Sequence, residues 1–141
     1  MPFVHAERVR FSDLDAMRHL NNVVFLRYFE TARIAFIRTL LPEHDPAAPE
    51  AAAHGLIFAE CTIRYRSPVQ FDEEVAIRCT IGEVRRSAFE VPFEMHAGDR
   101  LVAEGSGWLV GYDYAQERAA PLHDGLRAAL QEDTAPAGDR A

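Results

Sequence analysis

The stretch DLDAMRHLNN, residues 13–22, concentrates side chains that can do chemistry. It places two carboxylates, one histidine and two asparagines directly before a long apolar run, VVFLRYFETARIAFIRTLL. The start of a long helix presents unpaired backbone N–H groups and a partial positive charge, which can polarise a carbonyl or hold an oxyanion. A carboxylate just upstream could attack that carbonyl, or draw a proton from attacking water. The stretch therefore suits acyl transfer, particularly hydrolysis of an ester or a thioester.

The same residues also have a purely structural interpretation. Asn21 or Asn22 is a suitable N-cap, and Asp13 and Asp15 favour the positive end of a helix dipole. His19 can be a turn residue whose hydrogen bonds are satisfied locally. The residues alone leave both interpretations open.

The apolar run predicts a helix from Asn22 to Leu41, because neither proline nor glycine interrupts it before Pro42. At about 100° per residue its apolar side chains form one broad face, and only a narrow stripe around Arg27, Thr31 and Arg38 is polar. Such a helix should be enclosed by other structure. The face comprises Val24, Phe25, Tyr28, Phe29, Ala32, Ala35, Phe36 and Leu40, widened by Leu26 and Ile37.

Apolar residues alternate with polar ones in several other segments, a period that is typical of strands. Short connections between these segments predict an antiparallel meander. In the first strand we expect an irregularity near Glu7. The predicted strands cover residues 3–12, 57–66, 75–84, 89–96 and 101–112.

These elements predict an α+β fold, a five-stranded antiparallel sheet wrapped around one long central helix. Residues 42–55 form a loop in this interpretation, with a helical turn at 49–53, and residues 121–133 form a short helix. We expect a single domain over residues 1–133 and a frayed tail over 134–141.

Proline, glycine and cysteine positions refine the predicted sheet. Pro92 indicates an edge strand or a bulge. Three glycines on one face of the last strand, at 105, 107 and 111, predict either close packing of the central helix, backbone near backbone, or a bulge. Cys61 and Cys79 lie in apolar strand segments and are expected to be buried free thiols.

Composition excludes several classes of protein. The chain has 141 residues and a net charge of −7, whereas nucleic-acid binding needs a broad basic surface. All 15 basic residues are arginine. The N-terminal segment has no apolar signal core, and no apolar run approaches the ~20 residues that a bilayer needs. A cytoplasmic enzyme or binding domain, without nucleic acid or membrane as partner, is the expectation.

Other catalytic motifs do not fit. Gly105-Ser106-Gly107 is not a nucleophile elbow, because Ser106 lies within a predicted strand. No phosphate loop or dinucleotide fingerprint is present. Asp15 and His19 could form a metal pair, but no third ligand is evident, so we expect neither a metal nor a cofactor.

The segment RFSDLDAMRHLNNVVFLRYFETAR, residues 10–33, strongly resembles the opening of hotdog-fold acyl-CoA thioesterases, in the 4-hydroxybenzoyl-CoA thioesterase-like branch. That branch has an Asp-x-Asp pair, then His-x-Asn-Asn, then a helix with a Glu-x-Ala-Arg ending. The corresponding segments here are 13–15, 19–22 and 30–33, and the resemblance continues weakly through 63–79 and 98–113. It implies a hotdog fold and hydrolysis of an acyl-CoA thioester to free acid and CoA.

The resemblance also assigns roles in this sequence. Asp15 faces the thioester, as nucleophile or as base for water, and the N–H that polarises the carbonyl lies at or near Asn22. His19 and Asn21 orient water, carboxylate or substrate. Asp13 is expected to be structural, and so is a pair formed by Glu30 and Arg33, three residues apart on the helix.

Basic residues are candidates for the CoA phosphates by the same resemblance. Arg85 and Arg86 lie at a strand connection, and Arg64 and Arg66 share one strand face. Each can equally be a solvated arginine. In this fold the ligand generally lies between two subunits, which implies a homodimer or a homotetramer.

Two other functions remain open. An enoyl-thioester hydratase on the same fold would also use Asp and His, although with a different spacing. A binding module without turnover is the second alternative, because many members of the branch have glycine two residues before the histidine, where this chain has Met17 followed by Arg18.

Overall fold

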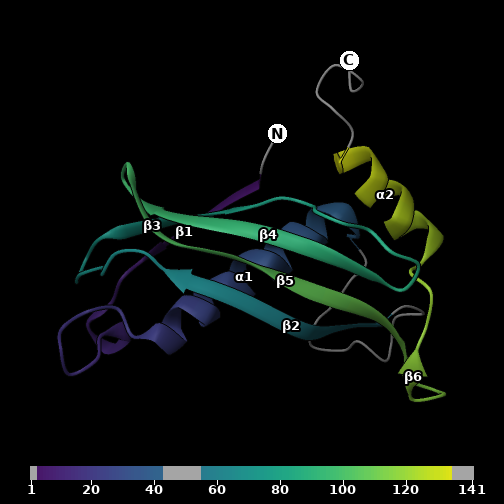
Figure 1. The fold of residues 1–141 in the computed structure, drawn as a ribbon, viewed down its shortest axis with the longest axis horizontal. Helices are drawn as coiled ribbons and strands as arrows, with labels where there is room; N and C mark the ends of the chain where they lie inside the picture. Colours follow the sequence, from purple (N-terminus) through teal and green to yellow (C-terminus); the bar gives the residue numbers. More distant parts are fainter. Residues whose placement is uncertain (1–2, 43–54, 135–141) are drawn as a thin grey trace.

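The structure is a computed structural model that describes residues 3–42 and 55–134. It is one antiparallel sheet with a long helix on one face and a shorter helix at one end (Figure 1). In chain order the elements are β1 (Phe3–Arg8), the 3₁₀ helix η1 (Phe11–Asp13), α1 (Asn22–Leu40), β2 (Gly55–Tyr65), β3 (Glu74–Cys79), β4 (Ala88–Ala97), β5 (Arg100–Asp113), β6 (Arg118–Ala119) and α2 (Asp124–Thr134).

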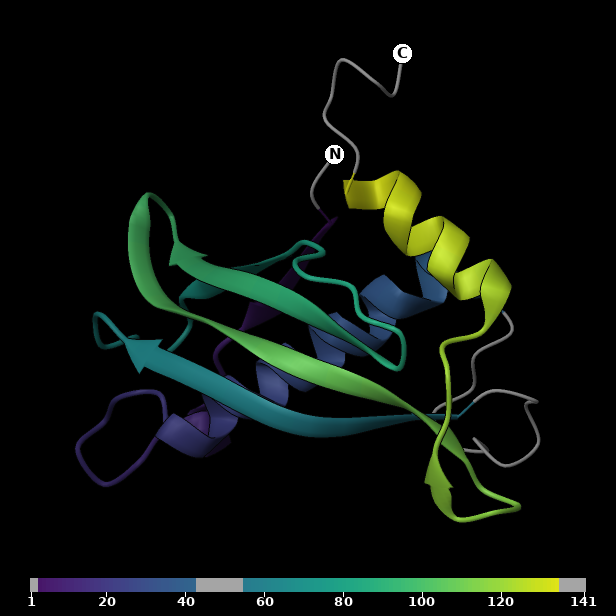
Figure 2. The same ribbon diagram turned by 45° about the vertical axis from the view of Figure 1, so that its right-hand side comes forward.

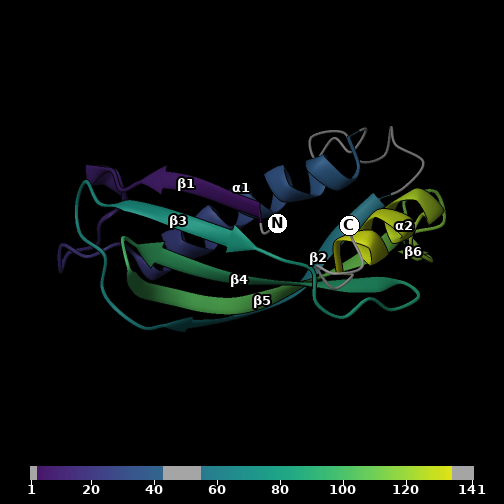
Figure 3. The same ribbon diagram turned by 90° about the horizontal axis from the view of Figure 1, so that it is seen from above.

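The strands follow the order β1-β3-β4-β5-β2, and the two-residue β6 pairs with β5. Seen from above, the sheet curves around α1 (Figure 3). The predicted α+β architecture is confirmed, with β6 as a short addition to the five expected strands. Because β2 is an edge strand, its outer side has no neighbouring strand among the described residues.

The predicted apolar face of α1 packs against the concave face of the sheet. All buried side chains of α1 except Arg33 belong to the predicted face; they are Val24, Phe25, Tyr28, Phe29, Ala32, Arg33, Phe36 and Ile37. The opposite side stays open near the start of the helix, where Val23 is 64% and Leu26 39% exposed. Within this chain the helix is therefore covered on its sheet side, and the prediction that it is enclosed on all sides is not met.

Helix α2 closes the end of the sheet opposite the start of α1 (Figure 2). Leu126 and Leu130 are buried from its inner face. The expected helix at 121–133 is thus present, starting three residues later. The predicted turn at 49–53 and most of the predicted tail lie outside the described residues.

Two predicted strands are shorter than expected. β1 ends at Arg8 with continuous register, so the irregularity expected near Glu7 is absent from β1. The chain turns into η1 instead, because the Asp13 carboxylate and Asp13 N–H bond back to Arg10. β3 ends at Cys79, and the following residues make only scattered bonds to β4, such as Gly82 N–H to Glu90 O.

Pro92 is neither on an edge strand nor at a bulge. It lies inside the central strand β4, paired with Ser106 of β5. Its carbonyl accepts a hydrogen bond from Thr80 N, just beyond the end of β3. Because the nitrogen and the carbonyl of a strand residue face the same neighbouring strand, the Pro92 nitrogen also faces the β3 side. The missing N–H therefore falls where the β3 ladder has already ended, so no regular ladder bond is lost.

The glycines of β5 do not make room for the backbone of α1. A side chain at Gly105 would collide with the backbone of Thr62 in β2. At Gly107 an added Cβ would lie 2.5 Å from a Phe58 ring atom and 2.9 Å from a Phe29 ring atom. Gly107 thus makes room for the rings of Phe58 and Phe29, and α1 contacts it through the Phe29 side chain and not through its backbone.

The expected ion pair between Glu30 and Arg33 is not formed. Arg33 turns into the core, where it is 7% exposed, while Glu30 is exposed. The guanidinium carbon lies 4.0 Å from the Phe58 ring centroid, a cation–π contact. Arg33 Nε is buried without a hydrogen-bond partner in the described chain, and burial lowers the pKa of this guanidinium.

Candidate active site

A tight turn presents Asp15 next to the start of α1. Leu14 and Leu20 form an antiparallel bridge, and Asp15 N donates to His19 O at 2.9 Å. Arg18 N then donates to Asp15 O at 3.0 Å, which closes the turn. Figure 2 shows this loop projecting from the end of the molecule where β2 also ends. The turn leaves the Asp15 side chain exposed.

The two oxygens of the Asp15 carboxylate have different environments. Oδ1 accepts hydrogen bonds from Met17 N at 2.9 Å and from His19 N at 3.3 Å. Oδ2 accepts none from the described residues. The backbone of the turn therefore orients the carboxylate through one oxygen and leaves the other available to a water or a substrate.

Helix α1 begins where the sequence predicts. Asn21 is the N-cap, and its side-chain oxygen accepts from Val23 N at 3.0 Å. The Asn21 side-chain oxygen is thus used for capping, and its amide NH₂ takes no part in the cap. Asn22 N finds no acceptor within residues 3–42 and 55–134, as expected for the first N–H of a helix.

His19 is half-buried in the returning arm of the turn. Its backbone N–H and carbonyl both bond to Asp15, so the backbone of His19 shapes the turn whatever its ring does. Of the two unusual residues at the tip, Met17 is 77% exposed and Arg18 has a left-handed φ of 67°. The position that favours glycine is therefore Arg18 in this chain.

Tyr65 ends β2 beside the helix start and was not among the predicted site residues. Its hydroxyl donates to Asn22 O at 3.1 Å, and its ring packs edge-on against Phe25 with centroids 5.1 Å apart. The only signal in the sequence was a tyrosine at the last apolar position of a predicted strand. That signal does not distinguish a core residue from a site residue.

The arginines proposed for CoA phosphates lie at two different ends of the molecule. Arg66 follows β2 directly, on the Asp15 side, and its Nε donates to Glu104 at 2.6 Å. Arg85 and Arg86 lie in the β3–β4 connection, whose carbonyls accept from Arg127 of α2 at the other end. The Arg85 guanidinium also stacks 4.4 Å from the Trp108 ring and pairs with Glu83.

Exposed apolar side chains lie on the two elements beside the turn. Val23 and Leu26 belong to the first turns of α1, and Phe58 and Tyr65 to the edge strand β2. Phe58 lies near the start of β2, whereas Tyr65 ends the strand, so only Tyr65 of this pair lies beside the helix start. Three pockets among the described residues do not include Asp15.

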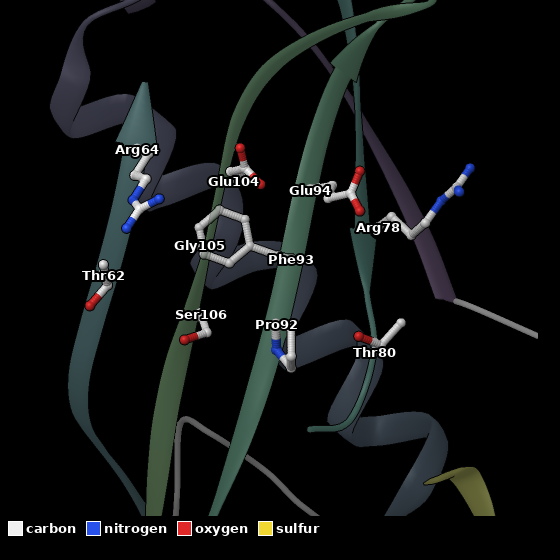
Figure 4. Close-up of a pocket in the computed structure, with 10 residues that line it drawn as sticks. All are labelled: Thr62, Arg64, Arg78, Thr80, Pro92, Phe93, Glu94, Glu104, Gly105 and Ser106. Atoms are coloured by element: carbon white, nitrogen blue, oxygen red, sulfur yellow. The ribbon is translucent and has the colours of Figure 1, made fainter. Parts of the chain in front are cut away.

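One of those pockets lies on the outer face of the sheet, away from α1 (Figure 4). It measures about 350 Å³ and is lined by side chains of four strands, β2 to β5. Arg64 and Arg78 flank it, together with Glu94 and Glu104. The sheet separates this pocket from the helix start, so it is not part of the Asp15 site.

Comparisons with known proteins identify the family and the fold. The family model of the thioesterase-like superfamily matches residues 9–130, and the chain belongs to that superfamily. A protein of Aquifex aeolicus (strain VF5), provisionally named an esterase, is 26% identical over 106 residues, which cover 75% of this chain and 81% of that protein.

Solved structures show the same fold. The 1,4-dihydroxy-2-naphthoyl-CoA thioesterase Slr0204 of Synechocystis superposes with a TM-score of 0.83 at 16% identity, covering 96% of this chain and all of that chain. SAV2348 of Staphylococcus aureus, solved in complex with CoA, gives 0.85 at 13% identity, with 96% and 87% covered. The expected hotdog fold and thioesterase class are confirmed.

Proposed function

We propose that this chain hydrolyses acyl-CoA thioesters to a free acid and CoA, with Asp15 as the general base. The observation that carries the proposal is the Asp15 carboxylate, which is fixed through Oδ1 by two backbone N–H groups while Oδ2 stays open. A base must be held in place and must still reach water. The exposed end of the turn meets both conditions.

The proposed reaction uses the residues as follows. Asp15 Oδ2 takes a proton from water as the water oxygen bonds to the thioester carbonyl carbon. The Asn22 N–H and the positive end of α1 stabilise the oxyanion of the tetrahedral intermediate. The C–S bond then breaks, the carbonyl re-forms, and CoA leaves as a thiol after taking up the proton. His19 and the Asn21 amide orient the water and the substrate.

The acyl group and the CoA arm need more surface than one chain provides at this site. Val23 and Leu26 of α1 and Phe58 of the edge strand β2 are exposed apolar residues. A second copy on this side would cover them and form the other wall of an acyl groove, which makes the active form a homodimer or a homotetramer. Sedimentation velocity at micromolar concentration tests this point, and a monomer would contradict it.

In such an assembly the arginines that contact one CoA molecule come from both subunits. Arg66 serves the CoA phosphates of the substrate held by its own Asp15, whereas Arg85 and Arg86 serve a substrate held by the partner. Replacing Arg66 or Arg85 by alanine should raise KM for acyl-CoA but not for the N-acetylcysteamine thioester of the same acid, which lacks phosphates. Equal changes for both substrates would exclude a phosphate contact.

The reaction takes place in the cytoplasm in this proposal, because two free thiols, Cys61 and Cys79, suit a reducing compartment. Neither helix in residues 3–42 and 55–134 has the length and hydropathy of a membrane-spanning segment.

The function is tested by thiol release. The purified chain is incubated with aliphatic and aromatic acyl-CoAs and a thiol reagent, and crotonyl-CoA absorbance is followed in parallel. We expect thiol release from at least one substrate class without loss of the crotonyl double bond. Loss of the double bond alone would indicate a hydratase, and tight binding without either signal would indicate a binding module.

A further inference from the structure

Asp13 is the one acid of the opening stretch that the proposed chemistry does not use. It is 6% exposed, and its Oδ2 accepts two hydrogen bonds. The hydroxyl of Tyr28 donates at 2.7 Å and the Arg10 N–H at 2.9 Å. Moving this buried carboxylate away from its donors is costly, because a buried polar group that loses a hydrogen bond is not compensated by water.

The backbone of Asp13 is also bonded to the start of α1. Its carbonyl accepts from Asn21 N, the N-cap, at 2.9 Å. Asp13 therefore lies at the base of the turn that carries Asp15, two residues before it, and touches the residue directly before Asn22. The two groups assigned to the chemistry are joined through this one residue.

Tyr28 links the same base to the body of the helix. It is 4% exposed and belongs to the buried face of α1. Burial and the neighbouring Asp13 raise the pKa of the Tyr28 hydroxyl, so this hydroxyl remains a donor across the working pH range. Leu20 N also donates to Val69 O at 2.7 Å, which fixes the returning arm of the turn.

We propose that Asp13 and Tyr28 are positioning residues, which together set the placement of the Asp15 carboxylate relative to the Asn22 N–H. The inference rests on the proposed thioesterase function. Tyr28 touches neither water nor substrate in this scheme and acts only through Asp13. Its hydroxyl holds Asp13 against the helix, which keeps the Asp15 carboxylate and the Asn22 N–H at a fixed distance from each other.

The test compares Tyr28→Phe with wild type on the best acyl-CoA substrate. We expect kcat to fall by about tenfold to hundredfold, the scale for a displaced catalytic group, with KM within about twofold. Tyr112→Phe is the matched control, because Tyr112 lies in β5 at the other end of the sheet and its hydroxyl makes no hydrogen bond within the described chain. It should keep the wild-type kcat.

The double variant Asp15→Asn/Tyr28→Phe distinguishes a positioning role of Tyr28 from a purely structural one. If Tyr28 acts through Asp15, adding Tyr28→Phe to Asp15→Asn should change the residual rate by less than about twofold. A further drop as large as in wild type would overturn the proposal. So would an unchanged kcat in the single variant, whereas an inactive wild type would instead refute the proposed function.

Amide hydrogen exchange tests the same proposal without an activity assay, which matters if a variant is obtained in poor yield. Amide hydrogen exchange of Asn21 should become at least about tenfold faster in Tyr28→Phe or in Asp13→Asn. The amide of Leu41, bonded to Ile37 O at the other end of α1, should not change. Equal acceleration at both amides, or at neither, would overturn the proposal.

Discussion

The hydroxyl of Tyr65 donates a hydrogen bond to the backbone carbonyl of Asn22, with 3.1 Å between the two oxygens. In the proposed mechanism the Asn22 N–H stabilises the oxyanion, so this bond ties the edge strand β2 to the residue that carries that proposed role. Together with the Phe25 ring contact, it fixes the first turn of α1 against the sheet.

We predict that Tyr65→Phe lowers kcat. The loss of a hydrogen bond worth about 1 kcal/mol allows the first helical turn to move, which should reduce the rate about three- to tenfold. Steady-state kinetics on one acyl-CoA tests this prediction, with Tyr114→Phe as control because Tyr114 lies beyond β5. An unchanged kcat would mean that the helix start needs no support from β2.

The turn before α1 carries strain that a substitution should relieve. Arg18 has φ of 67°, a conformation that a non-glycine residue adopts at a cost of about 1 kcal/mol. Arg18→Gly should therefore raise the free energy of unfolding in urea by up to about 1 kcal/mol. The matched variant Met17→Gly should not stabilise, since Met17 does not have a positive φ. Destabilisation by Arg18→Gly would show that the arginine side chain holds the turn.

The long elements could be predicted because their patterns are strong. α1 begins at Asn22 as expected and ends within one residue of the expected Leu41. The clean alternation in Phe89–Met95 located β4 within one residue at each end. Pro92 was misassigned because strand order is not visible in one sequence, and a proline is tolerated in a central strand where the neighbouring ladder has ended.

The residues that lie around the candidate site could be foreseen only in part, for a similar reason. Asp15, His19, Asn21 and Asn22 are neighbours in sequence, so their proximity followed from the chain itself. Tyr65 reaches the site through a contact across 43 residues, which no local pattern indicates. Arg33 was expected to pair with Glu30, because helical spacing permits it, but tertiary packing turned Arg33 into the core instead.

The buried guanidinium of Arg33 should be replaceable. It makes no ion pair in the described part of the chain, and a buried charge without a carboxylate partner seldom stabilises a fold. Arg33→Met should leave the free energy of unfolding unchanged or raise it by up to about 2 kcal/mol. The control Arg27→Met, on the exposed face, should stay within about 0.5 kcal/mol. A clear loss in Arg33→Met alone would contradict this prediction and would show that the cation–π contact with Phe58 outweighs the cost of burying the charge.

Alkaline pH should weaken the fold through Cys79. Burial raises the pKa of its thiol from 9.0 to about 12. The folded state therefore favours the protonated thiol, so its contribution is complete below pH 9 and is lost as pH rises towards 12. In urea unfolding at pH 8, 10 and 11, the stability of wild type relative to Cys79→Val should fall by up to about 1.4 kcal/mol per pH unit above pH 9. A constant difference would contradict this assignment.

The role of Asp15 is tested most directly by the rate of acyl-CoA hydrolysis in Asp15→Asn. Asparagine keeps an oxygen for the Met17 and His19 N–H groups, so the turn should be preserved while the base is removed. Asp99→Asn is the control, because Asp99 is an exposed acid in the β4–β5 turn. We expect Asp15→Asn to lose at least about a hundredfold in kcat and Asp99→Asn to match wild type. Equal rates in Asp15→Asn and wild type would contradict Asp15 as the base.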